Sequence, residues 1–218
     1  MKLTERTLKI LKNFSTINPG IVFKEGSELS TMSPSKSILA KAKVTEVFEQ
    51  RFALYDLSKF IATLSLFKDP ELEYANEHVV IKSDRSSVKY YFAGESLIIT
   101  PPDKDINVTD FDVEFQLTDE NLSMAIKALS TLGLPQLAFK GENGKVSICA
   151  LDSSGAIKDA YNLDITTTDK EFLAVFNAEN LKVIPDTYDV KISKKGISKW
   201  TSNDLVYFVV FEAKASKF

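Results

Sequence analysis

Few side chains in this sequence have the chemistry and spacing of a catalytic centre. The chain has one histidine, His78, and one cysteine, Cys149. A general base needs an acidic or nucleophilic group beside it, and Zn²⁺ sites use closely spaced cysteines or histidines, but the sequence contains no such pair. His78 lies in YANEHVVIKS, which has the pattern of a hairpin, and Cys149 lies among apolar residues in KVSICALD. We therefore expect a turn or strand-edge histidine, a cysteine that packs as a small apolar side chain, and no metal site.

The carboxylates offer no stronger candidate for catalysis. Asp110 and Asp112 are two positions apart, which places both on one side of a strand, but no third group is evident. The sequence also lacks the GxxxxGK[ST] and GxGxxG phosphate loops and the GxSxG nucleophile motif. A hydrolase or transferase is therefore the weakest functional hypothesis, and we expect a protein that is not an enzyme and has no cofactor.

Basic residues gather on one face of a helix predicted from Thr4 to Phe14, in LTERTLKILKNF. Thr4 is a favourable N-cap, and at 100° per residue the apolar side chains fall on one side. The other side carries four cations and one anion: Lys2, Glu5, Arg6, Lys9 and Lys12. The whole chain has a formal net charge of −3, and residues 103–120 hold seven acids and one base. Such segregation suits a surface that faces phosphates, although an ordinary solvated helix face has the same pattern.

Two further amphipathic helices are predicted. One begins after Asp56, in DLSKFIATLSLF, with a buried stripe from Leu57 to Phe67, and the other spans 119–132 after the N-cap Thr118. A short helix is predicted in AENLKVI, after Asn177. The polar faces contain no aromatic residue for base stacking and no recognition-helix motif, so any contact with DNA should be to phosphates and independent of sequence.

Many short segments between the helices alternate or are rich in β-branched and aromatic residues, as strands are. In the first half these are IVFKEG, ELSTMS, ILAKAKV, RFALYD, ELEYA, HVVIKS, SSVKYYFA and LIIT. In the second half they are QLAFKG, KVSICALD, KDAYNLDIT, EFLAVFN, TYDVKIS, GISKWTS and LVYFVVFEA. Similar phrases recur in the same order, such as LTERTLKIL with LTDENLSMA and IVFKEG with LAFKGENG. The sequence therefore predicts an α+β fold made by tandem duplication of one domain.

The boundary between the copies falls in PPDKDINVTDFD, where two prolines and four aspartates interrupt the pattern. We expect an N-terminal domain over 1–100, a connector over 101–110 and a C-terminal domain over 111–218. No apolar run is long enough to span a bilayer, and charges in MKLTERTLKI interrupt what would be the apolar part of a signal peptide. We therefore expect a cytoplasmic protein without a membrane partner.

Two stretches resemble the replicative sliding clamps of T-even-like bacteriophages: ILKNFSTINPGI (10–21) and LYDLSKFIATLSL (54–66). The resemblance implies clamp domains joined head to tail in a homotrimeric ring, with helices lining the hole and antiparallel sheets forming the outer wall. It implies that duplex DNA passes through the ring without sequence-specific contact, and that the clamp tethers the viral DNA polymerase in the host cell cytoplasm. It further implies an ATP-driven clamp loader as partner and a role in late transcription. The competing interpretation is a tandem β-rich viral structural or interaction protein without a DNA role.

Two sets of site residues follow from this resemblance. The residues expected to face DNA are Lys2, Arg6, Lys9, Lys12, Lys59, Lys127 and Lys182. Those expected to form a pocket for a partner peptide are Ile38, Leu39, Ile98, Pro102 and Phe211, for which a place in the sheet core is the alternative. The lysines of KISKKGISKW are a further basic cluster, which we interpret as a solvated hairpin turn.

Overall fold

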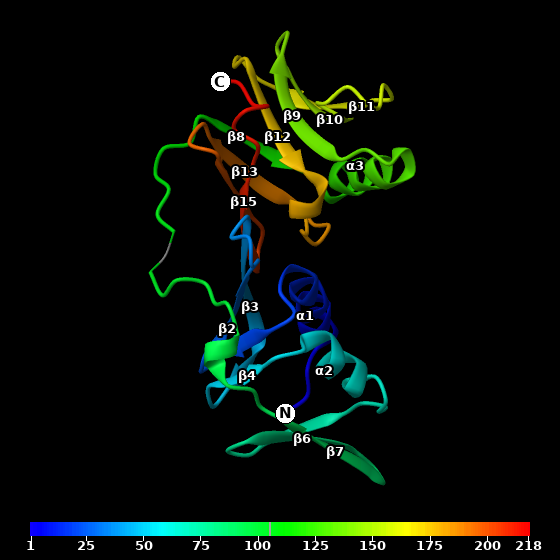
Figure 1. Cartoon of the computed structure of the whole chain (residues 1–218), viewed down its shortest axis with the longest axis vertical. Coiled ribbons are helices and arrows are strands. Elements are labelled where there is room, and N and C mark those ends of the chain that lie inside the picture. Colours follow the sequence, from blue (N-terminus) through cyan, green and yellow to red (C-terminus); the bar gives the residue numbers. More distant parts are fainter. Residues whose placement is uncertain (105) are drawn as a thin grey trace. The chain divides into compact units, whose positions relative to one another are not determined.

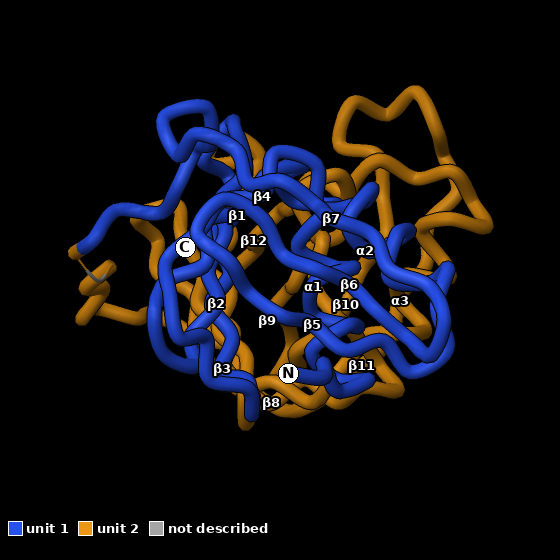
Figure 2. Tube along the Cα trace, turned by 90° about the horizontal axis from the view of Figure 1, so that it is seen from below, with its two compact units in different colours: residues 1–103 blue, residues 104–218 orange. Residues whose placement is uncertain are grey.

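Two units make up the chain, Met1–Asp103 and Lys104–Phe218 (Figure 1 and Figure 2). The computed structural model describes residues 1–104 and 106–218, so residue 105 of the predicted connector lies outside the described part. The division falls within the connector predicted over 101–110. Across the described residues, no helix has the length and apolar character needed to cross a membrane.

Helix α1 of unit 1 spans Glu5–Ile17 and begins where the sequence predicts, because the Thr4 hydroxyl accepts the N–H of Thr7 at 3.2 Å. It continues three residues beyond the predicted end at Phe14, since Ile17 extends the buried stripe by one more turn. Helix α2 spans Leu57–Leu64 after the predicted N-cap Asp56. The two helices lie side by side in the unit (Figure 1).

Antiparallel strands form the rest of unit 1. Strand β1 (Ile21–Phe23) pairs with β4 (Phe52–Leu54), and β2 (Gly26–Met32) pairs with β3 (Ile38–Phe48). A separate three-stranded sheet has the order β5 (Glu71–Tyr74), β6 (His78–Ser83) and β7 (Ser86–Tyr91). The strand predicted for LIIT is wrong: Glu95–Leu97 form the 3-10 turn η1, and the Ile98 N–H returns to the Glu95 carbonyl at 3.0 Å.

Unit 2 begins with β8 (Val113–Leu117) and helix α3 (Asp119–Leu132), whose predicted bounds are confirmed. Its first sheet has the order β11 (Tyr161–Thr167), β10 (Lys145–Leu151), β9 (Gln136–Glu142) and β12 (Phe172–Asn177). In its second sheet, β14 (Ile197–Thr201) lies between β15 (Leu205–Val210) and β13 (Tyr188–Ser193), and β13 also pairs with β8. The predicted helix in AENLKVI is reduced to the 3-10 turn η2 (Ala178–Asn180).

Aromatic side chains fill the core of each unit. In unit 1, the rings of Phe23 and Phe52 stack at 4.5 Å between centroids. In unit 2, Trp200 is fully buried with its ring 5.6 Å from that of Phe139, and its indole N–H donates to the Ser198 hydroxyl at 2.9 Å. Such buried aromatic pairs add to the stability that their apolar area provides.

The two units repeat one order of elements. Helix, four strands, a helical segment and three strands follow one another from α1 to β7, and again from α3 to β15. A matching hydrogen bond ends each series: Ala93 donates its N–H to Ala53 at 2.9 Å, and Glu212 donates its N–H to Val175 at 2.7 Å. The α+β fold with antiparallel sheets that the sequence predicts is confirmed, and the repeated bond supports the tandem duplication.

Candidate functional site

The outer face of α1 carries the basic side chains. Ile10, Leu11 and Phe14 are fully buried on the opposite face, so the helical period directs Lys9 and Lys12 to the solvent. Within the described residues, neither lysine forms an ion pair with an Asp or Glu of the chain. Two cations without internal counter-charges are therefore presented one helical turn apart.

Helix α2 extends this face with small side chains. Ser58, Lys59 and Ala62 are exposed, and α2 has no acidic residue over its eight positions. Asp56 is occupied at the N-cap, where its carboxylate accepts the Lys59 backbone N–H at 2.8 Å. The surface made by α1 and α2 can therefore lie close to a polyanion without acidic side chains from α2 in the way.

The remaining residues predicted to face DNA are placed less uniformly. Lys2 is exposed but pairs with Asp69 at 3.5 Å, and Lys127 is exposed on α3, whose first turn is acidic. Arg6 and Lys182 are half-buried, and neither is free of interactions with the rest of the chain. Lys9, Lys12 and Lys59 are therefore the predicted residues that the structure leaves most available to a phosphate.

A buried carboxylate from β3 fixes the start of α1. Glu46 is 7% exposed, and its two oxygens accept the Thr4 N–H at 2.5 Å and the Thr7 hydroxyl at 2.6 Å. Burial raises the pKa of Glu46, but the hydrogen bonds from Thr7 and Thr4 outweigh it and hold the pKa below its usual value. Sequence reasoning missed this contact, although alternation from Ala40 and Ala42 places position 46 on the inward face of β3.

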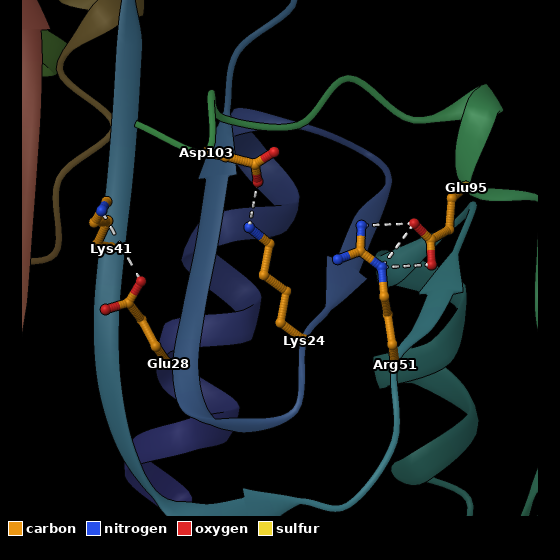
Figure 3. A network of polar contacts seen from close by, with 6 residues as sticks. All are labelled: Lys24, Glu28, Lys41, Arg51, Glu95 and Asp103. Atoms are coloured by element: carbon orange, nitrogen blue, oxygen red, sulfur yellow. Dashed lines mark hydrogen bonds and ion pairs between the residues drawn. The ribbon is translucent and has the colours of Figure 1, made fainter. Parts of the chain in front are cut away.

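The segment after β7 is tied to unit 1 by polar contacts (Figure 3). The Arg51 guanidinium donates to both carboxylate oxygens of Glu95, at 2.7–2.9 Å, and the Lys24 Nζ donates to Asp103 at 3.0 Å. Between these two links, the Asn18 amide donates to the Ile99 carbonyl at 2.9 Å. The segment is therefore held at three points, so it has a defined path over unit 1.

The predicted peptide-pocket residues are not alike in exposure. Ile38 is 1% exposed, and Leu39 and Phe211 are each 4% exposed, which favours the sheet-core interpretation for these three. Ile98 is half-buried against Gly20, and Pro102 is exposed. Beside them, Leu97 and Ile99 are large exposed apolar side chains that sequence reasoning assigned to a strand and therefore missed.

The acidic pair considered for catalysis serves a hairpin instead. Asp110 pairs with the Lys195 Nζ at 2.8 Å, and Asp112 accepts the Lys194 backbone N–H at 2.7 Å. These partners lower the pKa of both carboxyls. Lys194 and Lys195 lie in the turn between β13 and β14, so the interpretation of KISKKGISKW as a hairpin turn is confirmed.

The other candidates for chemistry lie in ordinary structural positions. His78 starts β6 and pairs with Tyr91, and Cys149 is buried in a small core cluster with Ala138 and Val175, where burial raises the pKa of its thiol. Over residues 1–104 and 106–218, no group of three or more His, Cys, Asp or Glu side chains is placed to hold a metal ion.

Comparison with known proteins identifies the family. The model of the DNA polymerase processivity factor matches residues 2–100, and that of the gp45 sliding clamp, C terminal, matches residues 114–213. The sliding clamp of Vibrio phage KVP40 is 32% identical over 220 residues, which cover 98% of this chain and all of that protein. The sliding clamp of Escherichia phage RB69 is 28% identical, with 99% of each chain covered.

Solved structures agree on the fold. The structure of the C-terminal region of FEN-1 bound to A. fulgidus PCNA contains a chain that matches with a TM-score of 0.73 at 13% identity, covering 97% of this chain and 96% of that one. The Helicobacter pylori beta clamp in complex with 3,4-difluorobenzamide matches with a TM-score of 0.66 at 15% identity, covering 97% of this chain and 65% of that one. The chain belongs to the sliding-clamp family of DNA polymerase processivity factors, which are non-enzymatic scaffold proteins of DNA replication.

Proposed function

We propose that the chain assembles head to tail into a homotrimeric ring that encircles duplex DNA and tethers the viral DNA polymerase in the host cell cytoplasm. The observation that carries the proposal is a pair of uncovered strand edges, one in each unit. An uncovered edge presents unpaired backbone groups that can bond to a strand of another chain.

Each unit has one sheet in which the chain itself covers one edge. In the sheet β5-β6-β7, the edge of β5 is covered where Leu72 donates its N–H to the Met1 carbonyl at 2.7 Å. In the sheet β11-β10-β9-β12, the edge of β12 is covered where Leu173 and Lys217 exchange two hydrogen bonds of 2.8 Å. The outer edges of β7 and β11 form no ladder with a further strand among the described residues.

The two uncovered strands are complementary. Within β7 the charged residue is Lys89, and within β11 it is Asp164. Tyr91 of β7 is 64% exposed, and its ring lies 5.3 Å from that of His78. Antiparallel pairing of β7 with β11 of the next subunit would cover both edges and bring Lys89 near Asp164, whose carboxylate already pairs with Lys145 at 2.6 Å.

Such an interface is heterologous, because it joins two different surfaces of the same chain. Heterologous contacts give a closed ring when the rotation between successive subunits returns the last subunit to the first. They give an open filament when it does not. Three subunits of two similar units would make a ring of six units, as the family resemblance implies.

The basic surface of α1 and α2 would face the DNA in this ring. Lys9, Lys12 and Lys59 would contact phosphates, with Lys127 of α3 as the counterpart in unit 2. Contacts of this kind carry no base readout, so binding should be weak and strongly salt-dependent, and DNA should be retained by topology.

Polymerase tethering would follow from effective concentration. A polymerase held on a ring that cannot leave the template rebinds the primer end more often than a free polymerase does. The exposed apolar segment around Ile98 and Pro102, with Leu97 and Ile99, is our candidate surface for its peptide. A clamp loader that hydrolyses ATP would open the ring, and the same tethering would serve late viral transcription.

Retention on circular DNA tests the proposal. After loading, the protein should stay on nicked circular DNA at a salt concentration that removes it from linear DNA, and linearisation should release it. Equal retention on both templates would contradict encirclement.

Charge reversal tests the DNA-facing surface. Lys9→Glu with Lys12→Glu should reduce polymerase processivity, and should lower the slope of log K against log salt by about 0.9 for each phosphate that the variant no longer neutralises. The matched control is Lys36→Glu with Lys43→Glu, which makes the same charge change at exposed positions of the β2–β3 hairpin. Equal effects of the two pairs would show that net charge, rather than the α1 surface, governs binding.

A further inference from the structure

A hollow of about 280 Å³ lies beside α1 in unit 1, at the point where α2 ends. Ile61 and Leu64 from the last turn of α2 and Leu72 of β5 line it, and all three are buried. Leu3 and Leu8, at the start of α1, line it as well, but they are only half-buried. The hollow is therefore apolar and open to solvent.

The short length of α2 leaves this surface uncovered. Helix α1 has 13 residues and α2 has eight, so α1 is about 20 Å long and α2 about 12 Å. After Leu64 the chain leaves the helix and reaches β5 only at Glu71. Leu8 therefore lacks the covering side chains that bury Leu11 and Phe14 completely.

The charged side chains at the hollow favour one orientation of a charged ligand. Lys2 and Asp69 pair with each other at 3.5 Å, so their charges largely cancel. Glu5 and Lys12 also line the hollow, and both are exposed on α1, about 10 Å apart along the helix axis. Lys12 attracts an anionic group at one end of the hollow, and Glu5 repels it at the other.

The strand at the hollow has no free backbone group for an extended peptide. Leu72, the strand residue that lines the hollow among the described ones, donates its N–H to the Met1 carbonyl at 2.7 Å, and its carbonyl accepts the Met1 ammonium at 2.8 Å. Extended peptides gain affinity from main-chain bonds to a free strand edge, so a compact ligand suits this site better. Since a dry cavity of about 150 Å³ accepts benzene, this volume suits an apolar body of about ten carbon atoms.

We propose that the hollow binds a small amphipathic anion, with an apolar body of about ten carbon atoms and one carboxylate. The body packs against Leu3 and Leu8, and the carboxylate lies beside the Lys12 Nζ. The bound anion then competes with DNA phosphates for Lys12. This competition rests on the proposed function, whereas the site itself does not, because every residue that lines it belongs to unit 1.

The test uses 2-naphthoate, which joins a ten-carbon aromatic body to one carboxylate. It is titrated into the full chain labelled with ¹³C in the methyl groups, and NMR shifts are measured. We expect saturable shifts of the Leu3, Leu8, Ile61 and Leu64 methyls, with a Kd of about 0.1–1 mM. The neutral control 2-naphthamide should bind about threefold to fivefold more weakly. Equal affinities of the two probes, or shifts confined to other methyls, would overturn the proposal.

Two matched variants test the role of Lys12. Lys12→Gln should weaken binding of 2-naphthoate about threefold to fivefold and leave that of 2-naphthamide unchanged. Lys9→Gln makes the same charge change one helical turn away, outside the hollow, and should leave both affinities unchanged. Both lysines are exposed, so both variants should fold. Equal weakening by the two variants would show that net charge binds the probe, and would refute the site.

Leu8→Ala tests the contact with the apolar body. It removes a half-buried side chain at the edge of α1, and should weaken binding of both probes alike by about fivefold. No loss of affinity for either probe would contradict the proposed contact.

Competition with DNA is measured separately, at equal ionic strength. Saturating 2-naphthoate should lower the affinity of the parent chain for duplex DNA and should not change that of Lys12→Gln. Intact methyl shifts with unchanged DNA affinity would overturn the competition and the DNA-facing role of Lys12. Absent methyl shifts would overturn the site itself.

Discussion

A proline at position 89 tests the proposed subunit interface without disturbing the fold of the subunit. Phe92 donates its N–H to the Glu77 carbonyl across the β6–β7 hairpin at 2.9 Å. The backbone groups of Tyr90, Val88 and Ser86, at every second position before Phe92, therefore face β6. In the alternation of an antiparallel ladder, Ser87, Lys89 and Tyr91 then direct their backbone groups away from the sheet. Lys89→Pro removes an outward N–H and leaves the hairpin bonds in place, as prolines on edge strands do.

The expected loss follows from counting bonds. Each interface loses one backbone hydrogen bond, a net contribution of about 1 kcal/mol. A closed trimer has three such interfaces, so assembly loses about 3 kcal/mol, or roughly 150-fold in the assembly constant. The midpoint of trimer dissociation scales with the inverse square root of that constant, so it should move to about twelvefold higher concentration. The proline ring also obstructs the approaching strand, which makes these values lower bounds.

Light scattering after size exclusion measures this shift over a dilution series. The parent should give a species of three times 24.3 kDa that dissociates on dilution, and Lys89→Pro should dissociate at the higher concentration. Lys89→Ala is the matched control, because it removes the same charge but keeps the N–H. If Lys89→Pro and Lys89→Ala dissociate at the same concentration while both keep the parent melting temperature, β7 is not the paired edge.

Three further changes probe the fold around the sites. Glu46→Gln should lower the free energy of unfolding at pH 7 by about 1–2 kcal/mol, measured by urea unfolding. Folding lowers the pKa of Glu46 from 4.5, so the ionised carboxylate stabilises the folded chain above that pH. This stabilisation should fade as the pH falls below 4.5. Gly141→Ala should lower the thermal midpoint, with a loss of about 1–3 kcal/mol, because a Cβ there would overlap the Lys170 carbonyl and the Phe172 ring. The Cys149 thiol should react with a thiol reagent only on unfolding, because burial shields it and raises its pKa, so alkylation faster than global unfolding would contradict its place in the core.

Local signals were sufficient to predict where α1, α2 and α3 begin, although α1 ends three residues later than predicted and α2 ends at Leu64, before the predicted Phe67. Thr4, Asp56 and Thr118 each act as the N-cap that their residue types indicate, and each precedes an apolar stripe of helical period. Gly133 ends α3 in the left-handed conformation, at φ 63°, which defines its last turn. These features depend on residues within one or two turns of each other, so a single sequence contains the information.

Contacts between distant segments could not be predicted in this way. The links Arg51–Glu95 and Lys24–Asp103 join residues 44 and 79 positions apart, and exposed carboxylates elsewhere in the chain would have suited either cation equally well. The failed strand prediction for LIIT has the same origin. Its apolar residues fit a strand, but the Asn18 amide holds Ile99 from outside the segment, and η1 shortens the path before it.

The end of β15 shows why strand pattern alone could not reveal the course of the chain beyond Val210. The alternating run LVYFVVFEA predicts one strand through Ala213, yet β15 ends at Val210. The Phe211 N–H still reaches the Gly196 carbonyl at 3.2 Å, but the next residue, Glu212, donates to Val175 in the other sheet of the unit. Alternation reports which side chains are buried, and Phe211 is buried as it predicts. It does not report which strand supplies the hydrogen bonds, and here the partner changes from Gly196 to Val175 of β12 between two consecutive residues.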